Sequence, residues 1–367
     1  MVTSIRDRHG TLGRIDAVHA TVRALPPDGP IRSVLTDPYL DECREWVRQD
    51  PDLENALWPP LLVWAMMPWH SPEQITLLDS DVRRIRDHPT SDPKAAVRWL
   101  ESKPVEGRAW RAGLFESTVK ARALAFSDTH PDWEVGFDAP LPSGRNADVL
   151  LRSAERSYYL ECTVITESDE DQEVHAAWME ARKAEPDLLL GRPGRFDPPG
   201  AKGPSPYYDA NRFYIKVFDK LQRGGDPAKT QTSAGSPNLL LLSCFPAFGS
   251  PLPFSPALGW ALDELFCGQP NMGSIKTMPQ HSPVTDISLL TFLRREWPAT
   301  ALDLAQCPRR LSGALLFNCL GLQEGRVNYN ADSPHRLTQL EMASLEAVFL
   351  PPRGWEQLQA RATPSSS

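Results

Sequence analysis

Residues 145–163 read RNADVLLRSAERSYYLECT, and this stretch decides how the middle of the chain folds. Two runs rich in apolar and aromatic residues, ADVLLRS and YYLECTVIT, flank the polar turn AERS. Such runs favour strands, and their spacing around a short turn predicts an antiparallel hairpin. Each run carries one acid, Asp148 in the first and Glu161 in the second. Because acids are rarely buried without a partner, these two call for a common cation or an exposed face.

The segments around the hairpin predict an α/β domain. A long amphipathic helix is expected over residues 106–127, followed by a strand in DWEVGFDAPLP (132–142) and then by the hairpin. Further along, YYDANRFYIKVFDKLQRG (207–224) predicts a second main helix and PNLLLLSCF (237–245) a buried strand. The expected order is therefore helix, three strands, insertion, helix and strand, which gives a mixed central sheet flanked by helices.

The rest of the chain divides into three parts. Residues 1–105 are predicted to form an added N-terminal helical region, with residues 1–35 only weakly structured and helical segments from 37 onward. The main domain spans 106–350 and contains an acidic, then Pro/Gly-rich insertion at 167–206. A strand in RRLSGALLFNCLGL (309–322) and a closing helix in QLEMASLEAVFL (339–350) complete it. Residues 351–367 are expected to be a disordered tail.

Composition excludes several classes of protein. The formal net charge of the 367 residues is −8, whereas a non-specific nucleic-acid binder has a strongly basic surface. A local basic groove on an acidic protein could still bind nucleic acid. None of the six cysteines forms a CxxC pair, and no apolar stretch is long enough to span a membrane. We therefore expect a cytoplasmic protein with free thiols and no membrane partner. GxSxG, P-loop, GxGxxG and HExxH motifs are also missing.

The two hairpin acids could share a divalent metal. Asp148 and Glu161 are thirteen residues apart, which suits two adjacent antiparallel strands with both side chains near one end of the sheet. A third acid, Glu116, lies on the long preceding helix and could face the same cleft. Phosphodiester hydrolysis by metal enzymes needs carboxylates held on such rigid, neighbouring elements.

Over roughly residues 106–245 the chain resembles the PD-(D/E)XK nuclease superfamily, whose restriction-endonuclease-like core has the order αβββαβ. The resemblance is carried by Glu116 in LFEST, Asp148 in GRNADVLL and Glu161 in YYLECTV. It implies that these three acids hold Mg²⁺ or Mn²⁺, and that the backbone carbonyl of Cys162 completes the coordination. It also implies hydrolysis of phosphodiester bonds in nucleic acid, with DNA as the favoured polymer.

The sequence departs from the family pattern at Thr163. The family has a lysine two residues after the second acid, where it orients or activates the attacking water, and a threonine there supplies no positive charge. In some members the cation comes from the next helix, which here carries Arg212, Lys216 and Lys220 on one face. Lys216 is the narrowly preferred candidate, with Lys220 second.

Plainer interpretations of the same residues stay open. Asp148 could cap the turn SGRN, Glu161 could face solvent on an edge strand, and Glu116 could simply pair with Lys120 on the helix surface. The lysines of the later helix could form a solvated face. The protein could accordingly be an inactive nuclease-like fold that binds nucleic acid or protein. Its N-terminal helices could instead carry the function, by self-association or by binding a protein partner.

Overall fold

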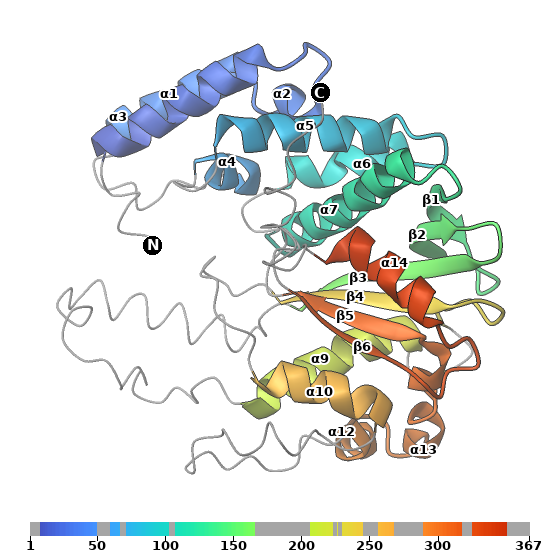
Figure 1. The fold of residues 1–367 in the computed structure, drawn as a ribbon. Helices are drawn as coiled ribbons and strands as arrows, with labels where there is room; N and C mark the ends of the chain where they lie inside the picture. Colours follow the sequence, from blue (N-terminus) through green and yellow to red (C-terminus); the bar gives the residue numbers. More distant parts are fainter. Residues whose placement is uncertain are drawn as a thin grey trace, which may run out of the picture.

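The structure of the chain is a computed structural model, and it describes residues 8–49, 59–66, 71–102, 107–165, 206–222, 226, 230–244, 256–267, 289–317 and 325–350. These residues form a six-stranded mixed sheet with helices on both faces (Figure 1). The predicted α/β class is therefore confirmed. The predicted tail at 351–367 and the insertion at 167–206, apart from its last residue, lie outside the described residues.

In the sheet, each strand is hydrogen-bonded to the strands that precede and follow it in the sequence, so the sheet order equals the chain order. Strands β1, β2 and β3 form an antiparallel meander, β3, β4 and β5 run parallel, and β6 closes the far edge antiparallel to β5. Their bounds are Glu134–Pro140 for β1, Asn146–Arg152 for β2, Ser157–Ile165 for β3, Asn238–Cys244 for β4, Gly313–Phe317 for β5 and Gly325–Tyr329 for β6. Strand β6 was not expected from the sequence.

The three main-domain helices predicted above are present within a few residues of their expected bounds, whereas the short helices at 301–304 and 307–310 were not expected. The long helix α7 precedes β1, and α9 lies between β3 and β4 in the sequence, so the predicted order of helix, three strands, helix and strand is present. The bounds are Gly107–Thr129 for α7, Pro206–Leu221 for α9, Pro256–Cys267 for α10, Leu289–Glu296 for α12, Ala301–Leu304 for α13, Cys307–Arg310 for the short 3-10 helix η5 and Gln339–Phe349 for α14.

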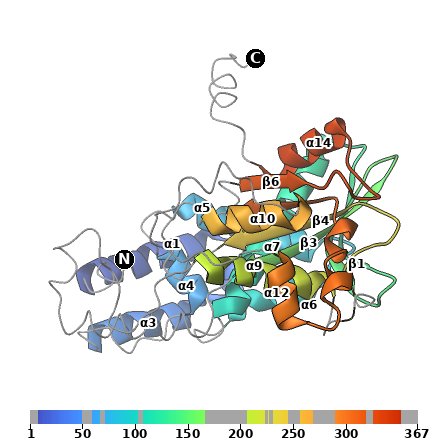
Figure 2. The ribbon, with the colours of Figure 1, turned by 90° about the horizontal axis from the view of Figure 1, so that it is seen from below.

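Two apolar layers sandwich the sheet, because successive side chains of a strand point to opposite faces. Leu239 and Leu241 of β4 belong to the cluster that contains α7, α14 and the N-terminal helices. Leu240 and Leu242 belong to the cluster that contains α9, α10, α12 and α13. Figure 1 shows these two groups of helices on opposite sides of the strands, and Figure 2, seen from below, shows α9, α10 and α12 in front of the sheet. Strand β4 is therefore buried on both faces, as its unbroken apolar sequence predicts.

The N-terminal region is helical from an earlier residue than expected. Residues 1–7 lie outside the described residues, and the prediction that residues 1–35 are weakly structured is wrong for residues 8–35, because Ile15, Val18 and Val22 bring one buried face of α1 into the core. Their spacing of three and four residues is helical, but the residues between them are alanine or polar, which weakens the apolar pattern. The bounds are Arg8–Ala24 for α1, Pro30–Val34 for α2, Asp37–Gln49 for α3, Pro60–Ala65 for α4, Pro72–Arg86 for α5, Pro93–Arg98 for α6 and Trp99–Glu101 for the 3-10 helix η2.

The closing helix α14 is tied to the sheet by one carboxylate. Glu341 and Thr338 form a capping box, in which each side chain bonds the backbone N–H of the other. The same carboxylate accepts hydrogen bonds from the Tyr158 hydroxyl at 2.7 Å and from Arg156 at 3.0 Å. Glu341 therefore caps its own helix and links it to β3.

Candidate functional site

The hairpin places the two predicted acids side by side. Its ladder sets Val149 opposite Leu160, so one further step along the same register sets Asp148 opposite Glu161. Directly opposed residues of antiparallel strands point to the same face of the sheet. Ile165, which alternation puts on the same face of β3 as Glu161, packs in the cluster around α9. The Glu161 side chain is 5% exposed and that of Asp148 is 19% exposed.

Helix α9 brings a cation to this carboxylate pair. Lys220, in the last turn of α9, donates from Nζ to Oε2 of Glu161 at 3.0 Å, and the same Nζ lies 3.8 Å from Oδ2 of Asp148. The backbone N–H of Cys162 also donates to Oδ2 of Asp148, at 2.6 Å. The helix is held against the sheet by buried residues such as Val217, which fixes the reach of Lys220. Two strands and one helix thus converge on a single ammonium group.

The electrostatics reflect two acids held in a poorly solvated place. Burial, with the nearby charge of Asp148, raises the pKa of Glu161 to about 8, while Lys220 and Arg145 act in the opposite direction. Burial lowers the pKa of Lys220, but Asp148 and Glu161 outweigh it, so the pKa of this ammonium is raised and it stays charged. Oε1 of Glu161 is buried without a hydrogen-bond partner among the described residues. The pair therefore keeps an acceptor that Lys220 does not satisfy.

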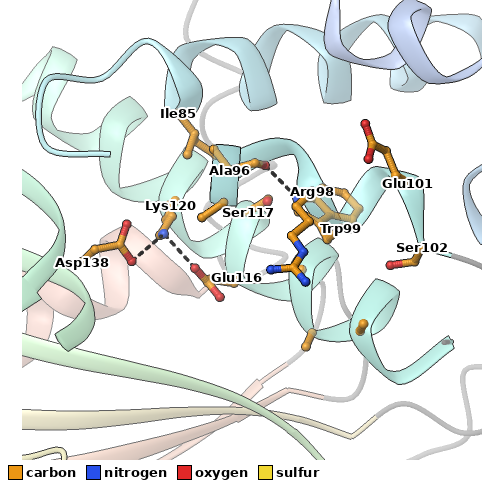
Figure 3. A pocket seen from close by; sticks show the side chains of 14 residues that line it. Ile85, Ala96, Arg98, Trp99, Glu101, Ser102, Glu116, Ser117, Lys120 and Asp138 are labelled. Atoms are coloured by element: carbon orange, nitrogen blue, oxygen red, sulfur yellow. Dashed lines mark hydrogen bonds and ion pairs between the residues drawn. The ribbon is translucent and has the colours of Figure 1, made fainter. Parts of the chain in front are cut away.

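A second charged cluster lies on the α7 side, where Figure 3 shows Lys120 between two carboxylates. Nζ of Lys120 is 2.7 Å from Oε1 of Glu116 and 3.6 Å from Oδ1 of Asp138, and its side chain is only 6% exposed. Asp138 has a φ of 52°, in the left-handed region that favours glycine, and aspartate is among the few other residues that tolerate it. This turn in β1 directs the Asp138 carboxylate to Lys120.

Glu116 connects the two clusters electrostatically. Burial raises the pKa of Glu116, and the charge of Asp148 raises it further, while Lys120 and Lys220 lower it. The expected pair of Glu116 with Lys120, one turn along α7, is present, but it does not lie on an exposed helix surface, because the Lys120 side chain is buried. That pairing leaves the second carboxylate oxygen of Glu116 for another partner. Three acids from α7, β2 and β3 therefore influence one another, with one lysine on each side.

Two plainer interpretations of the strand acids are wrong. Asp148 accepts from the backbone of the neighbouring strand rather than only capping its own turn. Glu161 does not face solvent on an edge strand, because β3 lies inside the sheet between β2 and β4. The reason is the same in both cases, since the acids lie on the interior face that α9 covers.

The lysine preferred from the sequence is not the one beside the acids. Lys216 lies one turn before Lys220, is half-buried and makes no ion pair with the described residues. Thr163 is half-buried and, by strand alternation, shares the face of Glu161. The side chain of Cys162 points to the opposite face, in the α7 cluster, where burial raises the pKa of its thiol well above the usual value. Only its backbone is turned toward the acids.

Lys120 and Asp138 were not predicted as part of this region. The helical spacing of Glu116 and Lys120 already suggested an ion pair. Nothing in the sequence marks Asp138, because the side of the strand to which it points depends on its unusual backbone conformation.

These residues suit a divalent cation only in part. Within the described ranges, no three His, Cys, Asp or Glu side chains group closely enough to form a metal site by themselves. Asp148 and Glu161 nevertheless offer two adjacent carboxylates, and one of them has a buried oxygen without a partner. Mg²⁺ commonly takes one or two protein carboxylates and completes its shell with water and substrate phosphate. The donor set is therefore compatible with such an ion.

Comparison with known proteins gives no match. No protein-family model matches the chain, and no match is found among the curated proteins or the solved structures. In the part of the chain that is described, no helix has the length and apolar character needed to cross a membrane.

Proposed function

We propose that this protein is a metal-dependent nuclease that hydrolyses phosphodiester bonds, most favourably in DNA, on a restriction-endonuclease-like αβββαβ core. One observation carries the proposal: the Lys220 ammonium lies within ion-pair distance of two carboxylates, Asp148 and Glu161, from adjacent strands. The family pattern needs two strand acids and a lysine, and here α9 supplies the lysine that position 163 lacks. Buried, strongly shifted titratable groups of this kind are typical of functional sites.

In this proposal Asp148 and Glu161 hold Mg²⁺ or Mn²⁺, with Glu116 and the carbonyl of Cys162 nearby. A bound metal ion of this kind supplies a Lewis acid and lowers the pKa of its water. Lys220 is at present the counter-charge of both acids. Once they bind a cation, its ammonium is free to donate to a phosphate oxygen or to orient the attacking water. The Thr163 hydroxyl, on the same face, can add a hydrogen bond but no charge.

Cleavage assays on the full chain test the proposal. Linear and supercoiled DNA, and RNA, are incubated with Mg²⁺, with Mn²⁺ or with a chelator. We expect cleavage only with metal, its loss in Asp148→Asn and Glu161→Gln, and a drop of at least about 100-fold in Lys220→Met. Lys216→Met, one turn away on the same helix, is the matched control and should keep its activity. Full activity in both acid variants would overturn the assignment of the site.

One observation favours a second function. Lys220 already compensates both strand acids, so the cluster could serve only to join α9 to the sheet in an inactive nuclease-like module that binds nucleic acid or protein. Calorimetric titration separates the two. DNA binding without Mn²⁺ binding and without cleavage supports the inactive module, whereas Mn²⁺ binding that Glu161→Gln abolishes supports the nuclease.

A further inference from the structure

A pocket of about 670 Å³ lies between the N-terminal helices and α7. Its walls come from α5, α6, η2 and α7, and Asp138 of β1 closes one side (Figure 3). The volume is within the range of about 300–1,000 Å³ typical of small-molecule sites. Glu116 of the candidate metal site is one of the lining residues, so the pocket adjoins that site.

Two serine hydroxyl groups that line this pocket have no hydrogen-bond partner among the described residues. They belong to Ser102, which is 5% exposed, and to Ser117, which is 6% exposed. The neighbouring Thr118 behaves differently, because its hydroxyl donates to the carbonyl of Leu114 within α7. A hydroxyl can both donate and accept a hydrogen bond. The two serines can therefore offer hydrogen bonds to an occupant of the pocket.

The charges that line the pocket are unevenly distributed. Lys120 is held between Glu116 and Asp138, so it is not available to an anion. Arg98, by contrast, is exposed and has no ion-pair partner among the described residues, and in Figure 3 its guanidinium extends along the pocket. Short alanine side chains such as Ala112, and the Trp99 ring, supply apolar walls. The pocket thus combines a chamber that has apolar walls with two hydroxyls, the accessible cation of Arg98 and, at its η2 side, the carboxylate of Glu101.

We propose that this pocket binds one unpaired nucleotide of the substrate strand, with its base among the alanines and serines and its phosphate on Arg98. The inference rests on the proposed nuclease function, because the shared residue Glu116 links the pocket to the candidate metal site. A neutral, flat base that carries hydrogen-bonding edges matches the chamber, and a phosphate matches the guanidinium. An unpaired base enters without the unstacking that a duplex requires. The substrate class that follows is single-stranded or locally unpaired nucleic acid.

Binding of deoxynucleoside monophosphates to the metal-free protein tests this inference without any cleavage. Calorimetry and the total tryptophan fluorescence, to which Trp99 contributes, report the binding, with inorganic phosphate and plain nucleosides as comparison probes. Ala112→Leu fills the chamber from an exposed helix position and should weaken mononucleotide binding at least about tenfold. Ala125→Leu, exposed on the same helix outside the pocket, should leave it unchanged.

A second pair of variants keeps the test valid if a filled chamber disturbs folding. Arg98→Ala should weaken mononucleotides but not nucleosides, while Lys94→Ala on the same helix removes an equal charge and should change neither. Equal binding by wild type and both pocket variants, or binding of phosphate alone, overturns the inference. Cleavage of paired DNA that is unchanged in these variants also overturns the inference, but it leaves the proposed nuclease function intact. Nucleotide binding without any cleavage supports the proposed pocket and contradicts the proposed nuclease function.

Discussion

Replacing Lys220 with methionine removes the ammonium that joins α9 to the two strand acids. Lys216→Met is the matched variant, because it removes the same group from the same helix one turn earlier, where no ion pair with the described residues exists. Methionine keeps most of the length of the apolar stem in both cases. We expect the free energy of unfolding to fall for Lys220→Met and to change little for Lys216→Met.

The size of the loss follows from burial. Removing one partner of a buried ion pair costs about 3–5 kcal/mol, because the other charge is left uncompensated. The Lys220 side chain is 19% exposed, and solvent therefore screens part of the interaction. A loss of about 2–4 kcal/mol is expected for Lys220→Met. For Lys216→Met the change should stay within about 0.5 kcal/mol.

The loss should also depend on pH. The pKa of Glu161 is raised from 4.5 to about 8 although Lys220 lowers it, so the pKa rises further in Lys220→Met. A carboxyl whose pKa is raised on folding binds protons more tightly in the folded state. Its contribution to stability is complete below the unfolded pKa and is lost as the pH rises toward the folded pKa. Between about pH 5 and about pH 8 Glu161 keeps its proton in both folded proteins, so both lose stability in parallel. The deficit of Lys220→Met should therefore grow only at higher pH, from about pH 8 to about pH 10.

Urea denaturation followed by circular dichroism measures both effects. Free energies of unfolding are compared for wild type and the two variants at the two ends of this pH range. The dependence of the free energy on urea concentration should be the same for all three proteins. Equal losses for the two lysine variants would refute the placement of Lys220. A deficit for Lys220→Met that does not grow with pH would refute the account of Glu161.

Three further predictions concern stability. Glu161→Gln should flatten the decline of the urea midpoint between about pH 5 and pH 8, whereas Glu155→Gln in the exposed turn of the same hairpin should follow wild type. Glu341→Ala removes the cap of α14 and its links to β3, so thermal unfolding should show a loss of about 2–3 kcal/mol; an unchanged melting temperature would contradict this. Ile15→Ala should cost about 2–4 kcal/mol in a single unfolding transition, because α1 shares a core with the sheet, whereas Leu302→Ala, which is 68% exposed, should cost almost nothing.

Much of the fold follows from local patterns. Strands β2, β3 and β4 carry apolar, β-branched or aromatic runs, and α7 and α9 carry apolar residues at helical spacing. The opposition of Asp148 and Glu161 was also predictable, because a tight hairpin fixes its own register. These features depend on residues close together in the chain.

The remaining features depend on packing between distant segments. The choice between Lys216 and Lys220 is set by how α9 rotates when residues such as Val217 pack against the sheet, which the helix sequence alone does not reveal. Strand β6 reads GRVNY, which is short and polar, and it pairs only because β5 offers it an edge. Asp138 reaches Lys120 only through its left-handed backbone.

The register of the β2–β3 hairpin has a consequence for evolution. A shift of one residue between these strands would turn Glu161 to the opposite face and separate it from Asp148. Insertions and deletions between positions 148 and 161 should therefore be eliminated by selection wherever the pair is used. The interval of thirteen residues between the two acids, followed by a lysine in the next helix, offers a pattern by which distant homologues can be sought.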